Sequence, residues 1–306
     1  MIGDWKWRYL DNLGPSLAYH RSGHKPFSDE VARVLSELNQ NGVATTSARR
    51  LLGEDSCYND LSEAIDSLER DSGDQIAAAR KAANGPDGWK NYLIELLGKH
   101  PPLDPDSVYS RFALQPRILR IVSAYFGMFT RLRLYNVWHN FACEATPRNS
   151  QLWHRDPEDR YVLKVFVYHS DVDEGSGPFT FAIGSHSKGG LKRQPAYSRT
   201  QEDRARRSTD AQMAEVVPPE RWKIATGPKG TMVLADTRGY HKGGFAKGRD
   251  RVLYMCMFAS QASRYPELFD RPRKLSLPLG LNREQIFALS ARREEVRRAA
   301  DRQPER

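Results

Sequence analysis

Four residues that lie far apart in the sequence carry the side chains from which a catalytic metal centre can be built. His154 and Asp156 stand in QLWHRDPED, His241 in DTRGYHKGG and Arg251 in GRDRVLYM. Two imidazoles and one carboxylate form the facial triad that holds non-haem Fe(II) and leaves coordination positions open for oxygen chemistry. Arg251 follows ten residues after His241, and its planar guanidinium can bind the carboxylate of an organic co-substrate. Together these residues predict an oxygenase.

A His-x-Asp pattern is weak evidence by itself, and the sequence contains a second copy, HSD at 169–171. Strand alternation places His154 and Asp156 on one side of an extended segment, as two ligands of one ion require. The second copy stands where a strand runs into an acidic turn, and alternation directs His169 away from the face that carries Phe166. We therefore interpret the second copy as a solvated strand end.

The spacing of His241 and Arg251 predicts an antiparallel hairpin. We expect His241 to close a strand, GGFAKG to turn the chain and Arg251 to open the return strand. Such a hairpin would place Arg251 beside the metal. A guanidinium that points into an apolar barrel needs an anion to offset its desolvation, and a bound carboxylate supplies one.

Hydrophobic periodicity indicates which elements position these residues. Helical spacing predicts four helices in the first part of the chain, carrying Val31, Val34, Leu35 and Leu38; Leu61, Ile65 and Leu68; Trp89, Leu93, Leu96 and Leu97; and the segment Leu114 to Phe126. From Arg131 the pattern alternates, which predicts strands within 131–141, 162–169, 179–183, 231–236 and 252–258. Strands separated by turn-rich loops are typical of a sandwich or barrel. A helix is predicted again over 284–298.

The absence of internal repeats and low-complexity linkers favours a single domain over residues 1–306. We expect a helical N-terminal flank at 1–130, a β core at 131–262 and a basic helical flank at 263–306.

The composition is that of an ordinary soluble protein, with 39% hydrophobic and 28% charged residues. No segment has the apolar length needed to cross a bilayer, and the start MIGDWKWRYLDNLG lacks the apolar region of a secretory signal. Three widely spaced cysteines are too few for a disulfide framework. These features favour a cytoplasmic protein with no membrane partner.

The net charge of +9 is concentrated in 271–306 and in the basic stretch 192–207. Basic clusters attract anions, although the C-terminal segment is equally well explained as a solvated helix. The stretch 192–207 falls where an insertion would cover the mouth of a barrel. Our hypothesis is that some of its arginines meet an anionic substrate, and the alternative is a solvated loop. No interleaving of aromatic and basic residues suggests base stacking, so the sequence disfavours nucleic acid.

Several motifs resemble those of the phytanoyl-CoA dioxygenase family of Fe(II)- and 2-oxoglutarate-dependent oxygenases. They are WHRD (153–156), the turn and strand DVDEGSGPFTF, IGSH (183–186), ADTRGYHKGG (235–244) and Arg251, and the similarity covers about 131–260. The resemblance implies a mainly β, double-stranded β-helix of the jelly-roll or cupin-like type, supported by N-terminal and C-terminal helices. It implies that His154, Asp156 and His241 hold iron and that Arg251 binds the distal carboxylate of 2-oxoglutarate.

The resemblance also suggests two further co-substrate contacts. Phe166 aligns with an aromatic position that packs near the co-substrate. Tyr135 is a candidate polar contact, with core packing of a satisfied hydroxyl as the alternative. Relatives often carry a hydroxyl residue two positions after the distal histidine, where this chain has Gly243. The remaining 2-oxoglutarate contacts are therefore open.

The ligand count indicates the reaction. Three protein ligands leave room on the iron for a chelating 2-oxoglutarate and for dioxygen. The expected reaction is hydroxylation of a C–H bond of a small-molecule substrate, with release of succinate and carbon dioxide; desaturation and ring closure remain open. The alternatives are a nucleic-acid-directed oxygenase and a barrel that binds a metal or ligand without turnover. The substrate and the oligomeric state are not encoded in these motifs.

Overall fold

Two antiparallel β-sheets form the centre of the structure, a computed structural model that describes residues 5–23, 26–53, 56–83, 92–144, 146–199 and 206–291. The six-stranded sheet has the order β1-β9-β4-β11-β3-β2, and the three-stranded sheet has the order β10-β5-β8. The bounds of the larger sheet are β1 Val43–Ser47, β9 Thr231–Asp236, β4 Leu163–Tyr168, β11 Arg251–Ala259, β3 Arg131–Asn140 and β2 Leu93–Glu95; those of the smaller are β10 His241–Gly243, β5 Phe179–Ala182 and β8 Trp222–Ala225.

The chain alternates between the two sheets, which makes the fold a double-stranded β-helix. It passes from β4 in the large sheet to β5 and β8 in the small one, returns to β9, crosses to β10 and returns to β11. A small ribbon of β6 Ser198–Arg199 and β7 Arg206–Arg207 pairs outside these sheets. The predicted double-stranded β-helix with helical flanks is confirmed.

Strand alternation separates two packed regions. On β11, Leu253, Met255 and Met257 point between the sheets, where they pack with Phe166 and Phe179. The alternate β11 residues, such as Tyr254 and Cys256, pack outward with the helices. The large sheet therefore has a buried cavity face and a buried helix face.

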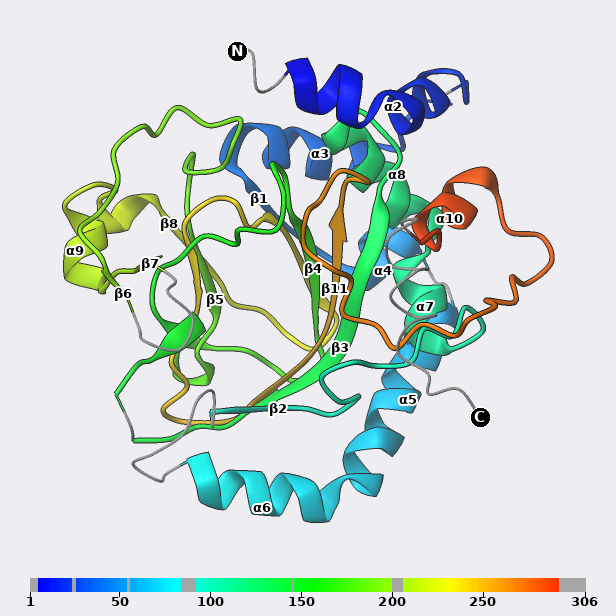
Figure 1. Ribbon diagram of the computed structural model, residues 1–306. Helices are drawn as coiled ribbons and strands as arrows, with labels where there is room; N and C mark the ends of the chain where they lie inside the picture. The colour runs from blue at the N-terminus through cyan, green and yellow to red at the C-terminus, as the bar shows by residue number, and fades with distance from the viewer. Residues whose placement is uncertain are drawn as a thin grey trace, which may run out of the picture.

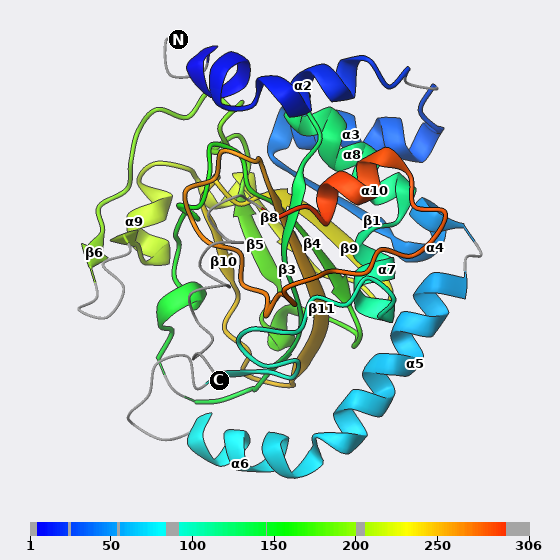
Figure 2. The same ribbon diagram turned by 45° about the vertical axis from the view of Figure 1, so that its right-hand side comes forward.

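Helices cover the outer side of the large sheet. They are η1 Trp7–Asp11, α2 Leu13–His20, α3 Asp29–Asn41, α4 Ala48–Leu52, α5 Ser56–Asp71, α6 Gly73–Ala83, α7 Val108–Ala113, α8 Pro116–Phe126 and α10 Arg283–Ala288. In Figures 1 and 2, α2 and α3 lie across one end of the β core, while α5 and α6 run past the other. Helix α9 Asp210–Ala214 lies apart from these, near β6 and β7. No helix among the described residues is long and apolar enough to cross a membrane.

Most of the predicted elements are present, with local corrections. The predicted helices around Val31, Leu61 and 114–126 are α3, α5 and α8, and Gly42 ends α3 with a left-handed φ of 82°. The predicted helix through Trp89 to Leu97 is wrong where the structure describes it, because Leu93–Glu95 pairs as an edge strand with β3; residues 84–91 lie outside the described residues. The C-terminal helix ends at Ala288, and 292–298 are likewise not described.

The predicted hairpin of His241 and Arg251 is also wrong. Strand β10 pairs with β5 in the small sheet, whereas β11 pairs with β3 and β4 in the large sheet. The segment between them therefore crosses from one sheet to the other. Arg251 approaches the site from the opposite wall of the barrel.

Candidate metal centre

His154, Asp156 and His241 are held together by backbone pairing at the small sheet. His154 and His241 form an isolated antiparallel bridge, in which each backbone N–H donates to the carbonyl oxygen of the other at 3.0 Å. The backbone N–H of Asp156 donates to Thr237 at 2.9 Å. These bonds hold the segment before β4 against the segment that leads into β10. His154, Asp156 and His241 therefore lie on the same wall of the barrel.

The three side chains converge on one point, and all three are buried. One ligand atom from each residue lies within 4.8 Å of the others. The Nε2 atom of His154 is 3.8 Å from Oδ1 of Asp156, and that of His241 is 3.8 Å from Oδ2. Among the described residues, this is the one group of three His, Cys, Asp or Glu side chains whose ligand atoms all lie close enough together to hold one metal ion. The predicted triad is thus brought together, in a spacing that a metal ion could bridge.

Hydrogen bonds orient both imidazoles with Nε2 toward the shared point. Nδ1 of His154 lies 2.8 Å from the carbonyl oxygen of Leu152, and Nδ1 of His241 lies 3.0 Å from that of Gly239. Since a carbonyl only accepts, Nδ1 carries the proton and Nε2 keeps its lone pair. Burial lowers the pKa of both histidines, which favours the neutral form that ligates a metal.

Lys164 brings a positive charge to this point. Its ammonium Nζ lies 2.7 Å from Oδ2 of Asp156, and both side chains are largely buried. Burial alone would raise the pKa of Asp156, but the neighbouring Lys164 ammonium outweighs it, so the net shift is downward and the carboxylate is ionised. Sequence reasoning missed this ion pair. The sequence feature that could have revealed it is the position of Lys164 on the same strand face as Phe166, which points into the cavity.

A cavity of about 340 Å³ opens onto the three residues. Both sheets contribute to its wall, and the residues that line it include the triad, Lys164, Phe166 and Arg251. The guanidinium of Arg251 is buried, and its Nε and Nη1 have no hydrogen-bond partner among the described residues. A buried cation with unused donors that faces a cavity is suited to binding an anion there.

Of the two further co-substrate contacts suggested by the resemblance, Phe166 lies at the cavity and Tyr135 does not. Phe166 lines the cavity, with its ring 4.9 Å from that of Phe179. Tyr135 does not line it, because alternation on β3 directs this side chain toward the helices. Its hydroxyl donates to the carbonyl oxygen of Pro102 at 2.7 Å, and its ring packs on Phe269. The structure thus agrees with the core-packing alternative for Tyr135.

The second His-x-Asp copy points away from the cavity, but it is not a solvated strand end as we had expected. His169 is buried, and its Nε2 lies 2.7 Å from Oδ1 of Asp66 on α5. Helix α5 covers this end of β4, which periodicity within the strand could not reveal.

Arg207 is the described member of the basic stretch 192–207 that reaches the cavity. It is buried on β7, and the neighbouring Ser208 pairs with Trp153 directly before His154. Its charge contributes to lowering the pKa of His154, and it partly opposes the rise that burial causes in the pKa of Tyr92. Lys192 and Arg193 are exposed, and residues 200–205 lie outside the described residues.

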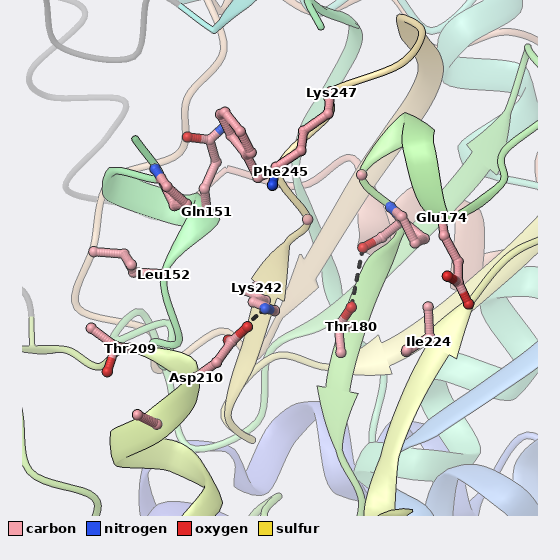
Figure 3. Close-up of a pocket in the computed structure, with 15 residues that line it drawn as sticks. Gln151, Leu152, Glu174, Thr180, Thr209, Asp210, Ile224, Lys242, Phe245 and Lys247 are labelled. Carbon is pink, nitrogen blue, oxygen red and sulfur yellow. Dashed lines mark hydrogen bonds and ion pairs between the residues drawn. The ribbon is translucent and has the colours of Figure 1, made fainter. Parts of the chain in front are cut away.

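A second, more open hollow of about 620 Å³ lies on the other face of the small sheet. Figure 3 shows Thr180 of β5, Ile224 of β8 and Lys242 of β10 along its wall, with Lys242 reaching Asp210. The Lys242 Nζ to Asp210 Oδ1 distance is 2.5 Å. Because Lys242 alternates with His241 and Gly243, the small sheet separates this hollow from the cavity at the triad.

Comparisons with known proteins concern the fold. No protein-family model and no curated protein matches the sequence. Among solved structures, the chain is similar to apo EctD from S. alaskensis, with 17% identity, a TM-score of 0.49 and coverage of 87% of this chain and 90% of that one. It is similar to the non-heme alpha ketoglutarate dependent carbocyclase SnoK from nogalamycin biosynthesis, with 16% identity, a TM-score of 0.48 and coverage of 78% and 88%.

HygX from Streptomyces hygroscopicus, solved with nickel and 2-oxoglutarate bound, has 13% identity, a TM-score of 0.48 and coverage of 79% of this chain and 90% of its own. We base the functional proposal on the residues of the site and not on these similarities.

Proposed function

We propose that the protein is an Fe(II)- and 2-oxoglutarate-dependent dioxygenase, similar to the phytanoyl-CoA dioxygenase family, that hydroxylates a C–H bond of a small molecule. The observation that carries this proposal is the buried convergence of His154, Asp156 and His241 on one cavity. Two neutral imidazoles and one carboxylate fit the donor set of non-haem Fe(II). The unused donors of Arg251 fit the carboxylate of an organic co-substrate.

The residues of the site have separable roles in this proposal. His154 and His241 would bind iron through Nε2, since their Nδ1 protons are donated to carbonyl oxygens. Asp156 would bind through its carboxylate while Lys164 holds one of its oxygens. Arg251 would bind the far end of 2-oxoglutarate, with Phe166 packing beside it. When bound, iron, 2-oxoglutarate and dioxygen supply the oxidising chemistry that releases succinate and carbon dioxide.

The cavity also supports an anionic group on the substrate. Arg207 is a second buried guanidinium at the wall, close enough to His154 to influence its pKa. Basic groups in a low-dielectric cleft attract anions and raise their local concentration. The substrate class proposed is therefore a small molecule that carries a carboxylate, phosphate or similar group.

The test is succinate release together with the identification of consumed metabolites. Purified protein with Fe(II), 2-oxoglutarate and a metabolite extract should form succinate and deplete specific compounds, measured by mass spectrometry. Asp156→Asn and His241→Ala should abolish both, whereas His169→Gln, in the second His-x-Asp copy, should not. Arg207→Gln should raise KM for acidic substrates more than it lowers kcat.

Two outcomes would contradict the proposal. Metal binding without succinate formation from any fraction of the extract would identify a non-catalytic binding barrel. Full activity of His241→Ala would show that the triad does not hold the metal. If neutral compounds were depleted and Arg207→Gln had no effect, the proposal of an anionic substrate would be wrong, while the proposed oxygenase activity would stand.

A further inference from the structure

The end of the cavity at Arg251 contains more hydrogen-bonding groups than a single guanidinium. An ionised carboxylate has two oxygens that accept about four hydrogen bonds, and a guanidinium fork supplies two of them. The rest must come from the protein or remain unmade at a cost in affinity. The wall beside Arg251 contains hydroxyl groups that can supply such a bond.

Tyr92 and Ser150 place a pair of hydroxyls at this wall. Both residues line the cavity, and their hydroxyl oxygens lie 2.6 Å apart. The backbone N–H of Ser150 donates to the Tyr92 oxygen at 3.2 Å. Burial raises the pKa of Tyr92, so the phenol keeps its proton. The pair holds two protons, and the bond between them uses one. The other has no acceptor among the described residues, so it is free to donate into the cavity.

Register and packing place this pair next to Arg251. Leu93, Asn140 and Arg251 are paired in one row across β2, β3 and β11, and Tyr92 directly precedes that row. A Cβ atom at Gly243 would lie 3.7 Å from Nη2 of Arg251 and 3.7 Å from the carbonyl oxygen of Ser150. Gly243 thus lies between the guanidinium and the Ser150 segment.

The backbone at this wall is also strained. Asn149 has a φ of 50°, the one positive value at a non-glycine residue among those described. It precedes Ser150 in the short helix η2 Asn149–Gln151, which is closed by reciprocal bonds between Arg148 and Gln151. Strain of this kind persists where the surroundings fix it, and it is concentrated at functional sites.

We propose that Tyr92 and Ser150 complete the binding site for the distal carboxylate of 2-oxoglutarate, opposite Arg251. This inference rests on the proposed function and deepens it. The hydroxyl pair supplies the donor that a side chain at position 243 would otherwise contribute. The small size of Gly243 leaves the space in which the carboxylate is held.

Calorimetric binding to the Mn(II)-loaded protein tests the inference without turnover. The probes are 2-oxoglutarate and 2-oxopentanoate, which has the same chain length but no distal carboxylate. A hydrogen bond to a charged group corresponds to roughly tenfold or more in affinity. Tyr92→Phe and Ser150→Ala should each weaken 2-oxoglutarate binding by about tenfold and leave 2-oxopentanoate binding unchanged.

Tyr168→Phe is the matched control. Its phenol is also buried and also influences Arg251, but its hydroxyl donates to the carbonyl oxygen of Ala225 at 2.6 Å. Its removal should not discriminate between the two probes.

Gly243→Ser in the Tyr92→Phe background gives a second, independent readout. The ordinary contact distances around the Cβ position leave room for a hydroxymethyl group beside Arg251. We expect this variant to recover most of the lost 2-oxoglutarate affinity.

The outcomes separate this inference from the proposed function. If the wild-type protein with Mn(II) does not bind 2-oxoglutarate, the proposed function is wrong. If it binds 2-oxoglutarate more tightly than 2-oxopentanoate but Tyr92→Phe and Ser150→Ala behave as wild type, the inference is overturned. Equal weakening of both probes, with no recovery in Gly243→Ser, also overturns it, because the effect would then be structural.

Discussion

At the scale of single residues, the site consists of charges whose burial is offset by specific partners. Asp156 is ionised because the Lys164 ammonium lies beside it, and the imidazoles are neutral because they are buried. Arg251 differs from these, since two of its nitrogens have no partner among the described residues. The protein therefore supplies its own counter-charge at the metal end of the cavity and leaves the anion-binding end to be completed by a ligand.

The ion pair between Lys164 and Asp156 is expected to stabilise the metal-free protein. Lys164→Met should destabilise the metal-free protein by about 3–5 kcal/mol, because the Asp156 carboxylate would be left buried without its partner. Unfolding in urea, followed by circular dichroism, measures this change. Added Mn(II) should recover much of it, since the cation then balances the carboxylate.

Lys223→Met is the control, because Lys223 is exposed on β8 and its loss should cost little. An unchanged unfolding free energy in Lys164→Met would show that the contact with Asp156 contributes nothing to the metal-free fold.

At the scale of elements, charged groups around the buried His139 attach the covering helices to the β core. His139 on β3 has Nδ1 3.0 Å from Oε1 of Glu69 on α5, and Nε2 2.7 Å from Oδ2 of Asp250, directly before β11. Arg80 on α6 also binds Asp250. With a carboxylate at each ring nitrogen, the imidazole donates from both and is charged. One histidine thus connects α5 to two strands of the large sheet.

This connection predicts a pH-dependent stability. Burial lowers the pKa of His139, but the bonds to Asp250 and Glu69 outweigh it, and the net shift is upward. A raised pKa contributes stability that is fully present below the unfolded value of about 6.5 and is lost as pH rises through the folded value. His139→Gln should therefore lower the unfolding free energy by about 1–3 kcal/mol at pH 6 and by less at pH 9.

Urea unfolding at the two pH values measures the difference, with His100→Gln as the control because His100 is exposed. A loss in His139→Gln that is the same at both pH values would mean that its charge plays no part.

At the scale of the whole molecule, the proposed metal site joins segments that the fold brings together from distant parts of the sequence. His154 and Asp156 precede β4, while His241 opens β10 after the chain has passed through both sheets. A ligand that binds only the native arrangement stabilises it by mass action, by about 2.7 kcal/mol at a hundred times Kd. Metal binding should therefore raise the stability of the entire β core.

A thermal unfolding series measures this effect. Mn(II) should raise Tm, 2-oxoglutarate should raise it further, and EDTA should reverse both shifts. Asp156→Asn should show neither shift at the same concentrations. A rise in Tm that persists in Asp156→Asn would place the bound metal elsewhere on the protein.

The sequence by itself picked out three residues that converge in the structure, an arginine that lines their cavity and most of the regular elements. Helical and alternating periodicities are local, so α3, α5, α8 and the long strands β3 and β11 could be predicted from neighbouring residues. The same alternation correctly directed His169 away from the face of β4 that carries Phe166. Chemistry that depends on residue type, such as two imidazoles and a carboxylate, could be recognised before any contact was known.

The tertiary structure alone decided which side chains meet. Periodicity specifies a face of a strand but not what covers that face, so it could not show that α5 buries His169 or that Tyr135 bonds to Pro102. It also could not distinguish a hairpin from a crossing between sheets at 241–251. The contacts of Lys164 with Asp156 and of Tyr92 with Ser150 join distant segments. Such contacts depend on how the two sheets pack around the cavity, and short-range patterns in the sequence do not predict that packing.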